Sequence, residues 1–79
     1  MVTARQRVED LKRRRLNLGR AYTQKWLAKR LLVTAQSVSS WETGNGNPPH
    51  EFLLRAWEMV IREAEEEIRD VLQNDGGAS

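Results

Sequence analysis

The chain has 79 residues, which allows one domain with a small core, because a domain of this size buries only about 60% of the surface that its unfolded chain exposes. It contains no cysteine, so disulfides and thiolate metal sites are excluded, and a second copy of the chain is the support that remains for so small a core. The net charge is +2, but it is distributed unevenly, with +8 in residues 1–40 and −6 in residues 41–79. This distribution is typical either of a protein with one side facing a polyanion or of a solvated helical surface.

Apolar residues recur at helical spacing throughout, and glycine and proline are confined to a few places, so the sequence predicts an all-α fold. The first helix is expected to open at a capping box made by Thr3 and Gln6 and to end at Gly19. Its inner face is predicted to carry Val8, Leu11, Arg15 and Leu18.

Two short helices should follow, each opened by a threonine. Thr23 is predicted to cap a helix through about Leu31, and Thr34 to cap a helix of barely two turns that stops at Gly44. The inner residues of these helices are expected to be Leu27, Ala28, Leu31, Val38 and Trp41. Only Leu32 and Val33 separate the two helices.

The last helix is predicted to begin at about Pro49 and to run without a breaker to Asn74. Its apolar residues follow an a/d pattern for three heptads, and Glu-before-Arg pairs at i,i+4 indicate a helix that stands partly in water. Its first half should cover the other helices, and residues 61–74 should form a dimerisation extension of a single domain spanning 1–74. The predicted dimer interface comprises Trp57, Ile61, Ala64, Ile68, Val71 and Leu72. Residues 75–79 are predicted to be a disordered tail.

The two short helices are typical of a helix-turn-helix, in which the first helix crosses the phosphate backbone and the second lies in the major groove. Residues on the outer face of the second helix must then be short and able to hydrogen-bond. The candidates on helix 34–42 are Ala35, Gln36, Ser37, Ser39 and Ser40, and none of them is acidic.

The same stretch resembles the lambda-repressor-like, or Xre, family of transcriptional regulators. The matching positions are Thr23-Gln24, Leu27-Ala28, Val33-Thr34, Val38-Ser39, Glu42, Gly44 and Pro48. The resemblance spans about residues 8–60, and so short a chain with a C-terminal extension looks most like the small controller-type regulators of restriction systems, phages and mobile elements. It implies a domain of five helices, or of four with a long last helix, and a dimeric repressor or autoregulator on a palindromic operator.

The resemblance also implies roles for individual residues. Gln36 would read an adenine, Ala35 could touch a thymine methyl group, and the serines would be less selective partners. Implied phosphate contacts are Arg20, Thr23, Gln24, Lys25, Thr34, Thr43, Asn45 and Asn47. Arg15 would pair with Glu42 as a structural link.

The sequence departs from the family pattern at two places. Leu32 stands where the family carries glycine, so a residue with a β-carbon has to occupy or avoid a left-handed conformation. Loop 19–23 is about two residues longer than usual, and the role of Trp26, as a lid on the first helix or as an exposed contact, stays open.

Other classes of function find less support. The single histidine, His50, stands beside Glu51 with no nucleophile or second metal ligand at helical spacing, so we expect neither an enzyme nor a metal site, and no cofactor. The main alternative is a helix-turn-helix-derived module that binds a protein, such as an antiactivator or antitoxin-like partner. Contact with RNA polymerase also stays open.

No run approaches the roughly 20 apolar residues of a membrane span and the start lacks the apolar run of a signal peptide, so we expect a cytoplasmic location.

Overall fold

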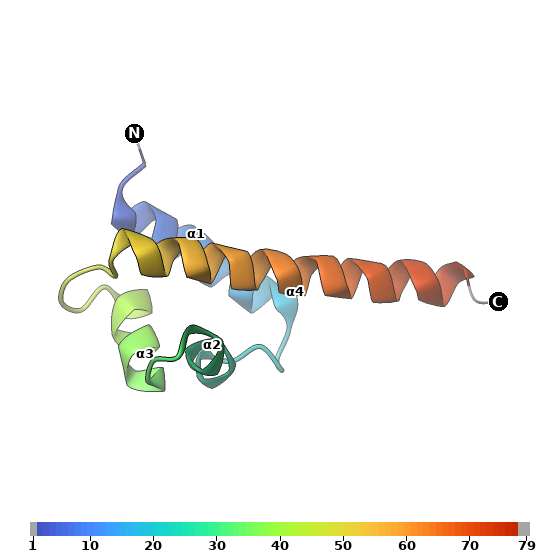
Figure 1. The fold of residues 1–79 in the computed structure, drawn as a ribbon, viewed down its shortest axis with the longest axis horizontal. Coiled ribbons are helices and arrows are strands. Elements are labelled where there is room, and N and C mark those ends of the chain that lie inside the picture. The colour runs from blue at the N-terminus through green and yellow to red at the C-terminus, as the bar shows by residue number, and fades with distance from the viewer. Residues whose placement is uncertain (1, 78–79) are drawn as a thin grey trace.

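The computed structural model describes residues 2–77, with side chains described through residue 73, and this part of the chain is all-helical with no strand. Helix α1 spans Ala4–Leu18, α2 Gln24–Leu31, α3 Ala35–Thr43 and α4 Glu51–Gly77. The predicted all-α class is therefore confirmed. Helices α1, α2 and α3 gather around the first half of α4, and the second half of α4 projects beyond them (Figure 1), so that the molecule measures 50 × 28 × 18 Å.

Side-chain caps open the first three helices where the sequence predicts them. The Thr3 hydroxyl accepts a hydrogen bond from the Gln6 amide at 3.1 Å, and the Gln6 side chain accepts one from the Thr3 amide at 2.9 Å, which completes the capping box. The hydroxyls of Thr23 and Thr34 accept from the backbone N–H groups of Trp26 and Ser37, each at 3.1 Å. These caps satisfy amides that have no partner inside their helices.

The long helix differs from its predicted bounds at both ends. It begins at Glu51 instead of Pro49, because His50 acts as its cap: the His50 carbonyl accepts from the Leu54 amide at 3.0 Å, and its Nδ1 accepts from the Phe52 amide at 3.1 Å. At the other end the helix continues to Gly77, beyond its predicted end at Asn74. Residues 78–79 of the predicted disordered tail lie outside the described residues.

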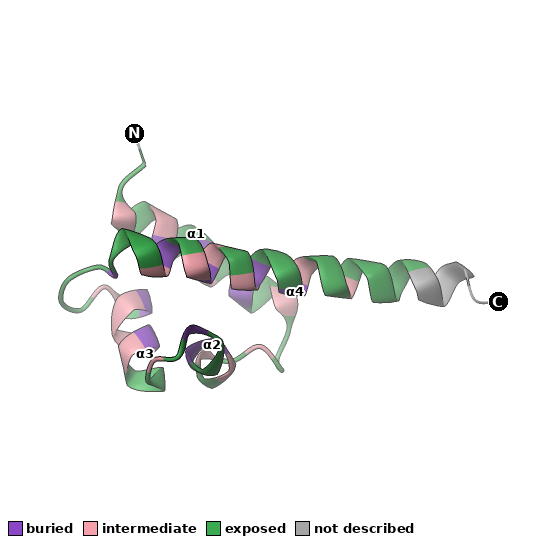
Figure 2. Ribbon diagram, viewed as in Figure 1, coloured by how far each residue is buried: buried purple, intermediate pink, exposed green. Residues whose placement is uncertain are grey.

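A single apolar core lies where the four helices meet (Figure 2). The predicted inner residues of α2 are all buried, and those of α1 are buried except Leu18, which is half-buried against the core. In α3, Val38 is buried and Trp41 is half-buried. The largest contribution comes from α4, where Trp57 and Ile61 are fully buried and Trp57 packs near Trp41 with ring centroids 6.4 Å apart. The buried apolar set is Val8, Leu11, Leu27, Ala28, Leu31, Val38, Leu54, Trp57, Ile61 and Ala64.

This core corrects half of the predicted dimer interface. Trp57, Ile61 and Ala64 are at most 4% exposed because their own chain covers them, so they offer no surface to a second copy. The heptad pattern continues unbroken along α4, so it does not show at which residue burial by the protein's own helices ends. Of the remaining predicted residues, Ile68 is half-buried, and Val71 and Leu72 are exposed.

A buried ion pair joins α1 to the end of α3, as the resemblance implies. The Arg15 guanidinium donates to both carboxylate oxygens of Glu42, at 2.8 Å each, and also to the Tyr22 carbonyl at 2.8 Å. The Gln24 side-chain amide donates to the same carboxylate at 3.0 Å. Every oxygen of the buried carboxylate therefore has a donor, which a charge removed from water requires.

Ion pairs at the surface hold α1 against α4. Arg14 donates to Glu65 through Nε at 3.1 Å and through Nη2 at 2.7 Å, and Arg7 pairs with Glu51. The hydrogen bond from Arg14, helped by its positive charge, lowers the pKa of the Glu65 carboxyl below its ordinary value. These ion pairs supplement the apolar core that α1 and α4 share.

Breaking the buried pair should be far more costly than breaking an exposed one. In Glu42→Gln the Arg15 charge stays buried without a counter-charge, so we expect a loss of about 3–5 kcal/mol in the free energy of unfolding, measured by urea denaturation. Glu58→Gln removes the carboxylate of the exposed Glu58–Arg62 pair and should cost about 0–1 kcal/mol. Equal losses in the two variants would contradict the structural role of Glu42.

Acid should destabilise the fold in part through Glu65. Because its pKa is lower in the folded than in the unfolded chain, its contribution is complete above the unfolded pKa and is lost as the pH falls through the folded pKa. Glu65→Gln should therefore flatten the fall in stability below about pH 4.5, measured by thermal unfolding across pH. Glu66→Gln, at an exposed neighbouring position, should keep the wild-type profile, and an unchanged profile in Glu65→Gln would refute the contribution of this pair.

Candidate nucleic-acid interface

The connection between α2 and α3 is short and closed by backbone hydrogen bonds. Leu32 ends α2 in the left-handed conformation, with φ 60° and ψ 41°, so this residue occupies the conformation instead of avoiding it. The Val33 amide donates to the Ala28 carbonyl at 3.0 Å, and the Leu32 amide donates to the Lys29 carbonyl at 3.4 Å. These bonds close the end of α2 in the way that glycine usually does at such a position.

Helix α3 has a buried face and an exposed face, as its spacing predicts. Val38 and Glu42 point into the protein and are at most 1% exposed, and Trp41 packs partly against the core. On the other side, Ala35 and Gln36 are exposed (Figure 2). Ser37, Ser39 and Ser40 are half-buried. The one acidic residue of α3 is buried and paired with Arg15, so the exposed face carries no carboxylate.

Several of the predicted contact residues meet in one shallow hollow beside α3. Its lining consists of Thr34, Gln36, Ser37, Ser40, Trp41, Asn45 and Asn47, and most of the surface that they present is polar. Residues from the start of α3 and from the loop after it therefore lie together, although as many as 13 positions separate them in the chain. Four of its side chains, those of Thr34, Gln36, Asn45 and Asn47, are exposed predicted contact residues that can hydrogen-bond.

Some predicted contact residues already use their side chains inside the protein. Thr23 and Thr34 cap their helices, and Thr43 donates to the carbonyls of Ser39 at 2.9 Å and Ser40 at 3.2 Å. The Gln24 amide is bound to Glu42. At the start of α2 the backbone N–H groups are the donors left for an anion, and Arg20 and Lys25 lie exposed nearby in sequence.

Arg5 is a residue of this region that the sequence did not single out. Its guanidinium reaches from α1 to the Gly44 carbonyl at 2.9 Å, just past the end of α3. Gly44 has φ 81°, and a β-carbon there would come within 2.9 Å of the same guanidinium. Because 39 positions separate Arg5 from Gly44, no local spacing could have indicated this contact.

Trp26 lies between α2 and α4 instead of covering α1. It stands edge-on to Tyr22 with ring centroids 4.9 Å apart, and the Arg30 guanidinium lies 6.0 Å from its ring. With Val60, Glu63, Ala64 and Glu67 of α4 these two α2 residues line a small hollow. Trp26 is therefore part of the packing of α2 on α4.

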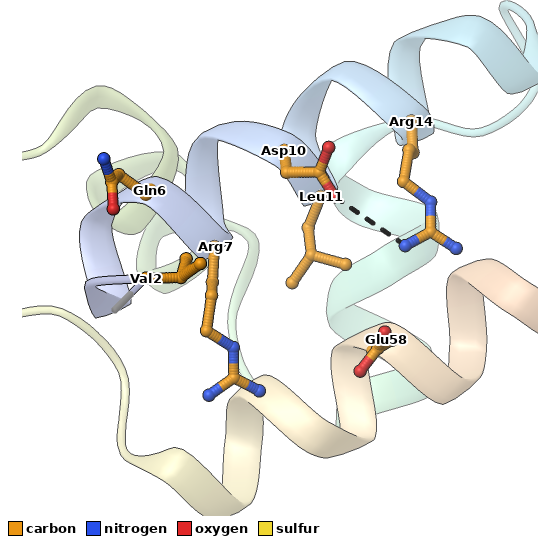
Figure 3. A pocket seen from close by; sticks show the side chains of 7 residues that line it. All are labelled: Val2, Gln6, Arg7, Asp10, Leu11, Arg14 and Glu58. Atoms are coloured by element: carbon orange, nitrogen blue, oxygen red, sulfur yellow. Dashed lines mark ion pairs between the residues drawn. The ribbon is translucent and has the colours of Figure 1, made fainter.

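A groove between α1 and α4 is lined by seven side chains, none of which is a predicted contact residue (Figure 3). It has a volume of about 300 Å³, with Leu11 at its floor and Arg7, Arg14, Asp10 and Glu58 among its lining side chains. Both arginines are already engaged in the ion pairs with α4, and Arg14 also lies 3.8 Å from Asp10. The two arginines of this groove thus link α1 to α4.

In the part of the chain that the structure describes, no three His, Cys, Asp or Glu side chains come together as metal ligands. None of the described helices is both long and apolar enough to cross a membrane.

The left-handed conformation of Leu32 should limit stability. Leu32 is 92% exposed, so Leu32→Gly loses almost no packing and removes the steric cost of a β-carbon at positive φ. We expect a gain of about 0.5–1 kcal/mol in the free energy of unfolding, measured by urea denaturation. Leu32→Ala keeps the β-carbon and should give no such gain. A glycine variant no more stable than the alanine variant would show that the turn is not strained.

The face of α3, the asparagines after it and the basic side chains near α2 are suited to hydrogen-bonding a polyanion. Since α3 is short, exposed at its N-terminal end and free of exposed carboxylates, it can approach a groove of such a polymer.

Comparisons of the chain with protein-family models, with curated proteins and with solved structures gave no match.

Proposed function

We propose that this chain is a sequence-specific DNA-binding transcriptional regulator of the lambda-repressor-like, or Xre, type. Helices α2 and α3 act as the helix-turn-helix, with α2 across the phosphate backbone and α3 in the major groove. The observation that carries the proposal is the exposed face of α3, where Ala35, Gln36 and Ser40 stand without a carboxylate among them. A helix in a groove lined by phosphates has to present such a face.

Gln36 is the residue that reads sequence. It is exposed at the start of α3, and its carboxamide can pair with N6 and N7 of adenine at the same time. Ala35 beside it is small enough to contact a thymine methyl group. The side chains of Ser37, Ser39 and Ser40 are half-buried and short, so they are less selective hydrogen-bonding partners.

Phosphate binding comes from the residues that flank α3. Asn45 and Asn47 share its hollow, and Arg20 and Lys25 add positive charge near the start of α2. Residues 19–31, which comprise the end of the loop and α2, hold four basic residues and no acidic one. The backbone amides that open α2 and α3 favour anions through the helix dipole, even where the threonine side chains serve as caps.

The regulator acts as a homodimer on a palindromic operator. Ile68, Val71 and Leu72 are the predicted interface residues that the core leaves at the surface. Two-fold symmetry would place the two α3 helices in successive major grooves about 34 Å apart. Occupying promoter DNA represses or autoregulates transcription, and activation would require an additional contact with RNA polymerase.

A protein-binding module is the second candidate, and one observation favours it. Phe52 and Met59 are large apolar residues of α4 that are 76% and 68% exposed. Binding through such residues changes little with salt, because it does not neutralise phosphates, whereas DNA binding falls steeply. Salt dependence therefore separates the two functions.

The DNA-binding assignment is tested with duplexes selected from random DNA by the purified protein. Gln36→Ala should lower the preference for the selected base by about 1–3 kcal/mol at one position of each half-site, while affinity for unrelated DNA stays unchanged. Lys25→Ala should weaken binding to all duplexes alike and reduce the salt slope by about one.

The matched control for the charge is Arg62→Ala, which removes one exposed positive charge from α4, away from α3. It should leave both affinity and salt slope near the wild-type values. If Gln36→Ala and Lys25→Ala bind the selected duplex as the wild type does, the assignment of α3 and α2 is wrong. A selection that enriches no sequence, together with salt-independent capture of a protein, would favour the second candidate.

A further inference from the structure

Arg5 of α1 lies against the loop that follows α3. The start of α1 and this loop belong to the same end of the molecule (Figure 1), and the Arg5 guanidinium donates from Nη2 to the Gly44 carbonyl at 2.9 Å. Beside this bond lies a hollow of about 100 Å³, lined by Arg5 and Val8 of α1, by Trp41 and by residues 44–48. An exposed side chain of the first helix therefore stands at the loop that carries Asn45 and Asn47.

The hollow beside Arg5 adjoins the hollow beside α3. Trp41, Asn45 and Asn47 line it, and the same three residues line the hollow that includes Gln36 at the start of α3. The loop after α3 is thus common to both hollows. Arg5 borders one of them and Gln36 borders the other, so the surface that holds the predicted DNA contacts extends as far as α1.

The positive charge of Arg5 is not neutralised by the described part of the protein. Arg7, Arg14 and Arg15 of the same helix each pair with a carboxylate of another helix. Among the described residues, no ion pair includes Arg5. Its hydrogen bond to Gly44 comes from Nη2, and a guanidinium also donates from Nε and Nη1. These donors are available to an acceptor outside the chain.

We propose that Arg5 binds a DNA phosphate next to those bound by Asn45 and Asn47, so that α1 contributes a third helix to the interface. The inference rests on the DNA binding of the proposed function and adds one contact to it. Phosphates of one strand follow each other about every 3.4 Å along the axis of the duplex, so a loop and a side chain bonded to it can reach neighbouring ones. A guanidinium suits such a contact because its planar N–H groups match two phosphate oxygens.

The bond to Gly44 prepares Arg5 for this contact. It holds the guanidinium beside the loop before DNA binds, so less side-chain freedom is lost in the complex. Glycine permits the close approach, since a β-carbon at residue 44 would lie 2.9 Å from Nη2. The same bond also suits a purely structural role, because a cation at the C-terminal end of α3 interacts favourably with the helix dipole. The two roles differ in whether the charge of Arg5 meets a phosphate.

The first test measures the affinity of the full chain for a selected and for an unrelated duplex over a range of salt concentrations. Arg5→Ala should weaken binding to both duplexes by about tenfold and reduce the salt slope by about one, because one phosphate is no longer neutralised. Arg5→Lys keeps the charge and should keep the wild-type slope.

The matched control is Arg13→Ala, which removes an exposed arginine about two turns further along α1. It should leave both affinity and salt slope at the wild-type values. A purely structural Arg5 predicts an unchanged slope, because the asparagines of the loop are neutral and release no counterions. An Arg5→Ala slope equal to that of the wild type would therefore overturn the inference.

The second test locates the phosphate. Wild type and Arg5→Ala are titrated with duplexes in which one phosphate at a time is replaced by an uncharged methylphosphonate. At one position in each half-site the replacement should weaken the wild type and have little effect on Arg5→Ala, since both changes remove the same contact. Losses that add at every position would refute the contact and leave Arg5 with its role at the end of α3.

The outcomes separate this inference from the function on which it rests. A wild-type protein that selects DNA with a steep salt slope, together with an Arg5→Ala variant that behaves as Arg13→Ala does, would refute the contact and leave DNA binding standing. A wild-type protein that binds no duplex would refute both.

Discussion

The buried pair of Arg15 and Glu42 is the constraint on which the arrangement of the helices depends. It joins the end of α1 to the end of α3. The Arg15 guanidinium also donates to the Tyr22 carbonyl, and the Glu42 carboxylate also accepts from the Gln24 side chain. One ionic group therefore fixes the loop before α2, the start of α2 and the angle of α3. Replacing such a pair with apolar residues is often neutral for stability, so its value here lies in specifying one orientation of α3. The exposed face of α3 is a consequence of that orientation, because the side that carries Glu42 has to point inward.

The charges of the molecule are distributed unevenly over its surface. Basic residues dominate α1 and α2, whereas acidic residues of α4 pair with α1, as Glu65 does with Arg14, or within α4, as Glu58 does with Arg62. Other acidic residues lie on the second half of α4, beyond the core. A polyanion would approach the basic side next to α3 and would be repelled by the far half of α4. That separation leaves the projecting half of α4 free for a second copy while α3 stays accessible, and the proposed dimer and the proposed DNA contact do not compete for the same residues.

Local chemistry made much of this fold predictable. The three threonine caps, the stop at Gly44 and the inward positions of Leu27, Ala28 and Val38 each depend on residues within one or two helical turns. The exposed side of α3 followed from the same spacing. Contacts between distant segments were not predictable, such as the bond from Arg5 to Gly44 and the place of Trp26 against α4. The burial of Ile61 and Ala64 was not predictable either, because the heptad pattern fits an internal core and a dimer equally well. Gln24 shows the same limit within the candidate site, since its sequence position suggests a phosphate contact and its side chain binds the buried Glu42.

The central claim is that the exposed N-terminal end of α3 contacts DNA. Amide chemical shifts of the labelled protein, followed by NMR during titration with duplex DNA at low salt, test it most directly, because even non-specific complexes form at dissociation constants of about 10⁻⁴–10⁻⁶ M. The largest shifts are expected at Ala35, Gln36 and Ser40 and in the loop that carries Asn45 and Asn47, with little change at Met59 on the outer face of α4. Shifts confined to α4, or none at all, would contradict the assignment of α3 as the DNA-reading helix.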